Sequence, residues 1–353
     1  MITRLFAAAF LFSLFYALLW PTGLEPVAWT PAAAPELSGI LSENSHLAKV
    51  ERLPTGDAGA PEGIARDTQG GVYAACEHGD ILHFGHPQSP AATIAKVDGR
   101  PLGIAVSTRG ELFVALPGSG LLRIPAGRRE GVLLSEVDGI PLGFVNGVAV
   151  AASGHVYFTD SSSRHGPADL HRELFEQRAS GRLIRYDPIS GRAETLLNDL
   201  YFPNGVTLGP GEAFALVAET FRYRILRVWL KGPRKGETTS FASNLPGFPD
   251  GISRGEHGIY WLALYAPRSP LLDVVMPYPF LRQILSRLPQ AIIPDPEAYG
   301  MVLGLDEAGK VVRNLQDPRG AFAPITDVAE YEGYLYLGSF DEPAVGRVEL
   351  PVH

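Results

Sequence analysis

The sequence lacks the residues that build disulfide frameworks, zinc sites and nucleic-acid surfaces. Its single cysteine, Cys76, cannot form an internal disulfide, and we expect it to be a small buried residue at the end of a strand. No Cys and His cluster has the spacing of a zinc site. Thirty Lys and Arg residues stand against 38 Asp and Glu residues, giving a formal charge of −8, and no basic run is long. We therefore expect no nucleic-acid partner.

Only one long hydrophobic run is present, and it lies at the N-terminus. Arg4 precedes apolar residues 5–20, which only Ser13 interrupts, a pattern typical of a targeting segment. Weakly apolar residues 24–29 lengthen it toward a tilted or interfacial anchor. The alternative is a signal peptide cleaved near small residues 32–34. We predict a signal anchor or signal peptide over 1–29 and a linker over 30–45. The rest of the chain is predicted to lie outside the cytoplasm, either membrane-anchored in a periplasmic, luminal or extracellular space, or secreted after cleavage.

What the sequence has in abundance is a repeated phrase: a turn or apolar residue, a second residue, Gly, an apolar strand, a polar turn and an aromatic-rich strand. The copies begin at Pro61, Pro101, Val145, Pro203, Pro249 and, more weakly, Ile325. Their second residues are Glu62, Leu102, Asn146, Asn204, Asp250 and Thr326, at spacings of 40, 44, 58, 46 and 76 residues. Periods of roughly 40 to 50 residues are typical of propeller blades.

The repeat predicts an all-β, six-bladed β-propeller over residues 46–353. In the first copy, residues 63–66, 71–75, 80–84 and 93–97 read as the four strands of one blade. Only one strand, near 345–350, follows the sixth phrase, so that blade lacks an outer member. We expect residues 47–53 to supply it and close the ring.

Two long spacings predict insertions in loops of the ring. Residues 161–180 contain a helix-prone stretch, and residues 266–300 form a second helical insertion, which we place between blades 5 and 6. In the second insertion the apolar side chains share one helical face, opposite the polar side chains. The apolar set is Phe280, Leu281, Ile284, Leu285 and Leu288, and the polar set is Arg282, Gln283 and Arg287. This helix is expected to pack on the propeller, to cover the channel as a lid, or to contact a membrane.

The second residue of each phrase should face the central channel, because it begins the innermost strand of its blade. Four of these residues carry oxygen, namely Glu62, Asn146, Asn204 and Asp250. Two carboxylates and two amides form a hard-oxygen set that suits Ca²⁺ better than Mg²⁺, which demands tighter octahedral geometry. Each dipeptide alone is also a common turn sequence. Their shared register favours a metal site.

These phrases resemble those of the calcium-dependent lactonase and phosphotriesterase superfamily, which includes senescence marker protein 30, gluconolactonases and paraoxonases. The metal-ligand phrases of that superfamily are similar to PEG at Pro61, NG at Asn146, PNG at Pro203 and PDG at Pro249, and the resemblance covers residues 46–350. The strictosidine-synthase-like branch, with its adipocyte plasma membrane-associated proteins, is nearer. It is similar in YFTDSSSR from Tyr157, GRLIRYDP from Gly181, FPNGVTL from Phe202, AETFRYRILRVWL from Ala218 and LPGFPDGI from Leu245. This resemblance implies a membrane anchor.

Two departures from these relatives bear on activity. The plant alkaloid synthases use a Glu where this chain has Thr326, so strictosidine-type condensation is not expected. Paraoxonases place a catalytic His where this chain has Leu102, and we expect His155 and His165 to be surface or turn residues.

The resemblance implies a calcium-dependent hydrolase of a small ester, lactone or related substrate, of the arylesterase or lactonase kind. Asp250 is the candidate catalytic base or nucleophile, while Glu62, Asn146 and Asn204 would chiefly hold the ion. Asp160 and Ser161 are further candidates for the lining of the same mouth. The alternative is a non-catalytic, calcium-stabilised propeller that binds a partner or lipid.

Overall fold

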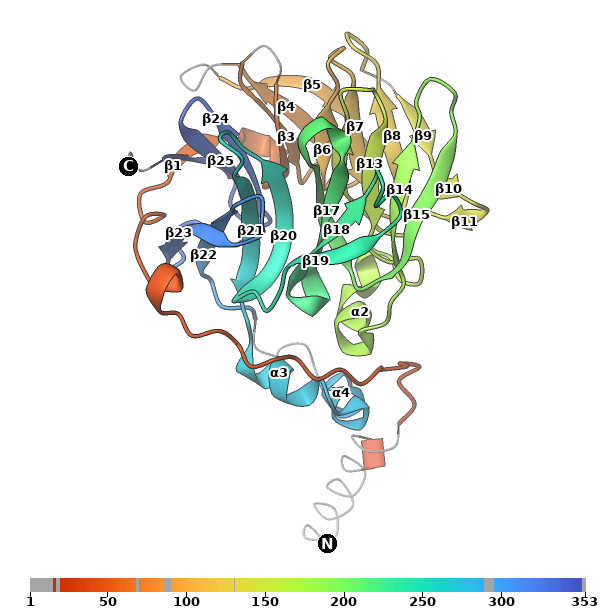
Figure 1. Ribbon diagram of the computed structural model, residues 1–353, viewed down its shortest axis with the longest axis vertical. Coiled ribbons are helices and arrows are strands. Elements are labelled where there is room, and N and C mark those ends of the chain that lie inside the picture. Colours follow the sequence, from red (N-terminus) through yellow and green to blue (C-terminus); the bar gives the residue numbers. More distant parts are fainter. Residues whose placement is uncertain are drawn as a thin grey trace, which may run out of the picture.

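The fold is a ring of six four-stranded antiparallel sheets around a central axis (Figure 1). The computed structural model describes residues 15–16, 20–67, 70–85, 90–129, 131–288 and 295–350. The predicted six-bladed propeller is confirmed. Blades 1 to 3 consist of β2 (Pro61–Arg66), β3 (Val72–Cys76), β4 (Asp80–Phe84) and β5 (Ala92–Lys96); β6 (Ile104–Val106), β7 (Leu112–Leu116), β8 (Gly120–Ile124) and β9 (Val132–Leu134); and β12 (Val145–Val150), β13 (Val156–Asp160), β14 (Gly181–Tyr186) and β15 (Ala193–Leu200).

The second half of the ring repeats this arrangement. Blades 4 to 6 consist of β16 (Pro203–Leu208), β17 (Phe214–Glu219), β18 (Arg224–Trp229) and β19 (Thr238–Ala242); β20 (Gly247–Arg254), β21 (Tyr260–Pro267), β22 (Gly300–Leu305) and β23 (Val311–Asp317); and β24 (Ile325–Tyr331), β25 (Tyr334–Ser339), β26 (Ala344–Glu349) and β1 (Glu51–Pro54). A separate hairpin joins β10 (Glu136–Val137) to β11 (Ile140–Pro141). Short 3-10 turns occupy η1 (Gly39–Leu41), η2 (Gly56–Ala58), η4 (Pro210–Glu212) and η5 (Thr220–Arg222).

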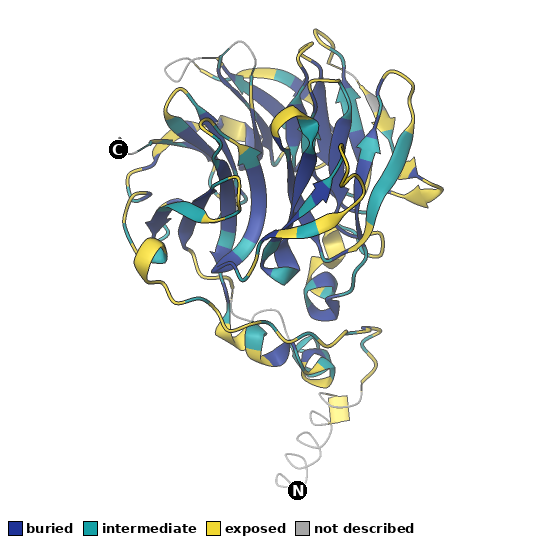
Figure 2. Ribbon diagram, viewed as in Figure 1, coloured by how far each residue is buried: buried dark blue, intermediate teal, exposed yellow. Residues whose placement is uncertain are grey.

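The hydrophobic core lies between the blades, as the buried inner and second strands in Figure 2 show. The second strands β7, β13 and β17 are buried at every position. A strand covered on both faces by neighbouring sheets needs a continuous apolar sequence rather than an alternating one. This explains why the second half of each repeated phrase is rich in aromatic and aliphatic residues.

The ring closes by pairing the two ends of the propeller. Strand β1 pairs antiparallel with β26, with Leu53 opposite Val345. The predicted donation of an outer strand by the N-terminal side is therefore confirmed.

Both insertions are helical and follow the second strand of their blade. The first contains η3 (Pro167–Asp169) and α2 (Leu170–Glu176), between β13 and β14. The second contains α3 (Pro270–Val275) and α4 (Pro279–Leu285), between β21 and β22. The second insertion therefore lies inside blade 5, and its predicted place between blades 5 and 6 was wrong. The repeated phrase marks only the two inner strands, so a long spacing does not tell on which side of the outer strands the extra residues fall.

The predicted linker, residues 30–45, is part of a longer strap over residues 20–50 that runs along the propeller (Figure 1). The carbonyl oxygens of Ala32 and Ala33 accept hydrogen bonds from Arg268 and Asn244, and Trp29 packs against Tyr223. Most of the predicted anchor, residues 1–14 and 17–19, lies outside the described residues. Among the residues that are described, no helix is long and apolar enough to cross a membrane.

Candidate functional site

The inner strands of all six blades surround one axial channel of about 630 Å³. Its lining includes the second residue of every phrase: Glu62, Leu102, Asn146, Asn204, Asp250 and Thr326. The structure thus brings all four predicted oxygen-bearing residues to one channel. Each of these four residues is less than a tenth exposed.

The glycine after each axial residue permits this convergence, because it lets neighbouring inner strands approach closely. A Cβ atom on these glycines would meet the backbone oxygen of the next axial residue. The pairs are Gly63 with Leu102, Gly103 with Asn146, Gly147 with Asn204, Gly205 with Asp250, and Gly251 with Thr326. On the second strand of blade 6, Gly338 meets Glu62 in the same way and completes the ring. The dipeptides are therefore not free turns: they sit in strands, and their glycines are required by packing.

The carboxyl groups of the channel are buried with little opposing charge. Burial raises the pKa of the Glu62 carboxyl to about 8, although the Arg100 guanidinium lowers it. Arg100 lies 3.8 Å from Glu62 and stacks 3.6 Å from the Phe340 ring centre. Burial, followed by the charges of Glu62 and Asp327, raises the pKa of Asp250 well above its ordinary value. The channel is thus an environment in which negative charge is poorly compensated.

Asp327 is a further buried carboxyl of the channel, beside Glu62 and Asp250, which was not among the residues predicted from the sequence. Burial raises its pKa to about 7, although the N–H groups of Ile64 and Val328 donate to it at 2.9 and 2.8 Å. The sixth phrase has Asp327 where the other five have glycine, and this departure was the available signal. Beside it, the Thr326 hydroxyl donates to the Glu62 carbonyl at 2.9 Å, so the axial position of blade 6 carries no ionisable group.

An apolar cluster packs around the axial Leu102 on the blade 2 to blade 4 side of the ring. Leu102 packs with Phe144, Phe202 and Phe221, and Leu174 of α2 lies against this cluster. The ring centres of Phe202 and Phe221 are 4.7 Å apart. Because α2 contributes to the cluster, the first insertion lies on the same face of the ring as the axial residues.

A tyrosine lies near the charged part of the channel. Burial, followed by the charges of Asp341, Asp250 and Glu62, raises the pKa of Tyr265 to about 12. Its hydroxyl therefore stays protonated at neutral pH and is a potential hydrogen-bond donor to a bound molecule.

Two further candidates from blade 3 have different roles. Ser161 accepts a hydrogen bond from the Asn146 amide at 3.3 Å, so it positions an axial side chain. Asp160 forms a fully buried ion pair with Arg182 at 2.7 Å and accepts the Phe144 N–H. Asp160 is therefore a structural carboxylate.

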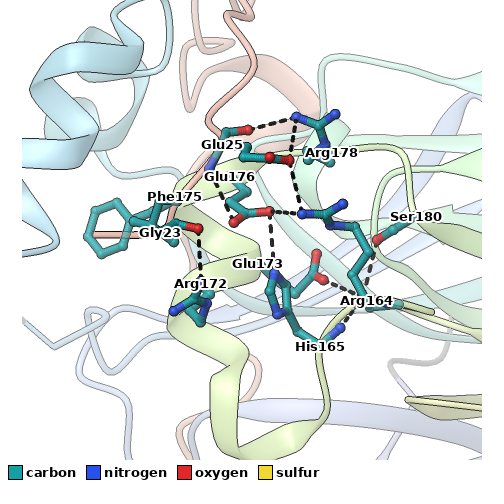
Figure 3. Close-up of polar contacts among 12 residues, drawn as sticks. Gly23, Glu25, Arg164, His165, Arg172, Glu173, Phe175, Glu176, Arg178 and Ser180 are labelled. Carbon is teal, nitrogen blue, oxygen red and sulfur yellow. Dashed lines mark hydrogen bonds and ion pairs between the residues drawn. The ribbon is translucent and has the colours of Figure 1, made fainter. Parts of the chain in front are cut away.

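Neither histidine considered from the sequence belongs to the channel lining. His155 contacts Ser153 in an exposed position. His165 is mostly buried, 3.3 Å from the Glu176 carboxylate (Figure 3). His165 lies in the loop at the start of the first insertion, and its side chain packs against α2 of the same insertion.

The axial residues suit a hard cation such as Ca²⁺. A side-chain oxygen of Glu62 is buried without a hydrogen bond, and the nearby carboxyl groups exceed the cationic groups that face them. A divalent ion would supply the missing charge, and amide oxygens are acceptable calcium ligands. In the part of the chain that the structure describes, no group of three or more His, Cys, Asp or Glu side chains is arranged to hold a metal. A site here therefore depends on the mixed set of carboxylates and amides.

Comparison with known proteins agrees with this architecture. Residues 144–233 match the strictosidine synthase family, and residues 39–84 match the strictosidine synthase-like N-terminal family. Over 215 residues the chain is 38% identical to the adipocyte plasma membrane-associated protein of Rattus norvegicus, covering 59% of this chain and 57% of that protein. The chain spans about half the length of the curated relatives it matches.

Solved structures show the same fold at lower sequence identity. A gluconolactonase from Xanthomonas campestris superposes with a TM-score of 0.63 at 18% identity, covering 94% of this chain and 99% of that one. The calcium-binding protein regucalcin from Agrobacterium tumefaciens gives 0.60 at 14% identity, covering 85% and 94%. In sequence, this chain is therefore similar to strictosidine-synthase-like proteins and to adipocyte plasma membrane-associated proteins, and it shares the six-bladed propeller fold with the gluconolactonase structure.

Proposed function

We propose that this protein is a calcium-dependent hydrolase of a small ester, lactone or related substrate. The observation that carries the proposal is the group of buried carboxyls in the axial channel, whose negative charge few cationic groups offset. The similar gluconolactonase and calcium-binding regucalcin structures support it as analogies of fold.

Glu62, Asn146, Asn204 and Asp250 would hold the ion. When bound, calcium supplies a Lewis acid that polarises a carbonyl or phosphoryl oxygen. Asp250 is the candidate base, since its carboxylate faces the channel and can take the proton of an attacking water, or attack directly as a nucleophile. Tyr265, which lies near Asp250 and Glu62, would be a hydrogen-bond donor, and the axial Leu102 would contact the apolar part of a substrate.

We also propose that the N-terminal segment anchors the protein in a membrane, with the propeller outside the cytoplasm. The apolar residues 5–20 after Arg4 support this topology, as does the similarity to proteins named as plasma membrane-associated.

Asp250→Asn tests the enzymatic role. The variant keeps the size and an amide oxygen at the axis but loses the base, so turnover of aryl esters and lactones should fall at least a hundredfold while the fold remains. Asp98→Asn, an exposed change between β5 and β6, is the matched control and should retain parental activity. Equal hydrolysis by Asp250→Asn and the parent would instead favour a non-catalytic, calcium-stabilised propeller.

A further inference from the structure

The two helices of the second insertion expose large apolar side chains. Leu271, Val274, Tyr278, Phe280 and Leu281 are 50%, 65%, 55%, 53% and 40% exposed. We call these five residues the α3–α4 surface. Figure 2 shows the exposed sides of α3 and α4 at the end of the molecule away from the blades. A contiguous surface of exposed apolar side chains usually marks an interaction site.

The opposite side of α4 is polar and faces the protein. Arg282 is fully buried and donates to the carbonyl oxygens of Phe175, Glu176 and Val27. Gln283 donates to the Leu24 carbonyl at 3.3 Å. Helix α4 therefore packs on α2 and the strap through its polar face, which leaves part of its apolar face exposed. The hydrogen bonds of its polar face hold α4 in place, and Phe280 and Leu281 point away from the protein.

Helix α4 is fixed to the rest of the protein through the strap and α2. The Glu25 N–H donates to the buried Glu176 carboxylate at 3.3 Å, and that carboxylate lies 3.5 Å from Arg164 (Figure 3). The Val27 N–H donates to the Glu176 carbonyl at 2.9 Å. The strap, α2 and α4 therefore form one connected unit, which gives the α3–α4 surface a fixed orientation relative to the propeller.

The N-terminal apolar segment enters at this same unit. Arg287, just after α4, donates through Nε to the Trp20 carbonyl at 2.7 Å. Trp20 ends the apolar run 5–20 and is 50% exposed, and Phe15 and Tyr16 within that run are also exposed. Trp and Tyr at the end of an apolar segment are typical of the membrane–water interface. The expected membrane anchor thus meets the protein beside the α3–α4 surface.

We propose that the α3–α4 surface lies on the lipid bilayer, with its apolar side chains inserted into the interfacial layer next to the N-terminal segment. The adjoining apolar run selects lipid as the occupant, because a segment that enters a bilayer beside Trp20 brings the membrane to these helices. Interfacial elements of this kind bury an apolar face at the boundary between headgroups and acyl chains. Since Leu174 of α2 packs against the cluster around the axial Leu102, and α2 is bonded to α4, this contact turns the face of the ring that carries α2 toward the membrane.

Single-cysteine labelling of the full-length chain in vesicles tests the proposal. Val274→Cys and Phe280→Cys each carry an environment-sensitive fluorophore, and the native Cys76 is fully buried. The vesicles contain phosphatidylcholine, phosphatidylserine and a lipid with a spin label near the headgroup end of its acyl chain. Ile189→Cys is the control, because Ile189 is 75% exposed in the turn between β14 and β15, at the opposite end of β14 from α2.

We expect the lipid-borne quencher to reduce fluorescence at positions 274 and 280 several-fold more than at 189. Equal quenching at all three positions would overturn the proposal. Blue-shifted emission at 274 and 280 without quenching by lipid would also overturn it, and would place the chain's own N-terminal segment or a second copy on these helices. Leu271→Cys is a second position for the case in which one labelled variant does not fold. The readout does not depend on hydrolysis, so its failure is distinguishable from failure of the proposed enzymatic function.

Discussion

A Cβ atom on Gly205 would lie 2.6 Å from the backbone oxygen of Asp250. Gly205 belongs to the inner strand of blade 4, and Asp250 is the axial residue of blade 5. Equivalent close approaches recur around the ring, so the axial residues meet because the backbones of successive blades nearly touch. The glycines of the repeated phrase therefore determine the dimensions of the candidate site.

We predict that Gly205→Ala destabilises the protein by about 1–3 kcal/mol or more, since backbone atoms on the next strand leave no room for the methyl group. Calcium binding should weaken as well, because the strand that carries Asp250 must shift. Thermal unfolding and calorimetric titration measure the two effects. Gly166→Ala is the control, because a Cβ there meets nothing within 4 Å and its φ is −88°. Similar melting temperatures for the two variants would contradict the packing argument.

Proton and calcium binding should compete at the axis. The pKa values of Glu62 and Asp327 rise to about 8 and about 7 on folding without metal. The folded chain then holds more protons than the unfolded chain between about pH 4 and about pH 8, so metal-free stability falls as the pH rises through that range. Bound calcium would replace these protons, so the loss of stability at high pH should not occur in the calcium-bound protein.

The gain in melting temperature on adding calcium should therefore be larger at about pH 8 than at about pH 5. Differential scanning calorimetry at both values, with and without a chelator, measures it. Glu62→Gln should reduce the difference between the calcium-induced gains in melting temperature at about pH 8 and about pH 5, because the variant lacks one of the protons that compete with calcium. A gain that does not change with pH in the parent protein would mean that calcium binds away from these carboxyls.

Arg282 should be essential for the attachment of the strap. Arg282→Met leaves the carbonyl oxygens of Phe175 and Val27 without their donor in a buried place, at a cost of about 2–3 kcal/mol. We expect faster hydrogen exchange at the Val27 amide, which bonds to Glu176, while exchange in the inner strands is unchanged. Arg234→Met, in an exposed pair with Glu237, is the control. Parental exchange at Val27 in Arg282→Met would show that the strap is held by other contacts.

The fold was predictable because each blade repeats one local pattern. The same phrase that gave six inner strands also aligned Glu62, Asn146, Asn204 and Asp250, and the structure places them in one channel. The strand that closes the ring was also predictable, because the sequence after the sixth phrase supplies blade 6 with only three of its four strands. In a repeat protein, residues at the same position of each repeat occupy equivalent places in the structure, so residues far apart in the sequence can be predicted to lie together.

Features outside the repeat were not predictable from periodicity. Asp327 takes the glycine position of the weakest phrase, and its partner Ile64 is distant in sequence. The orientation of α4 was left open, because helical periodicity shows that a helix has an apolar face but not what that face contacts. Arg282 donates to carbonyl oxygens of α2 and of the strap, and only the tertiary structure brings these two segments together.

Diffraction from crystals grown with calcium tests the central claim most directly. We predict one axial ion with oxygen ligands from Glu62, Asn146, Asn204 and Asp250, at distances of about 2.3–2.6 Å. An ion bound elsewhere, or an axis that stays free of metal at saturating calcium while these four side chains keep their positions, would contradict it.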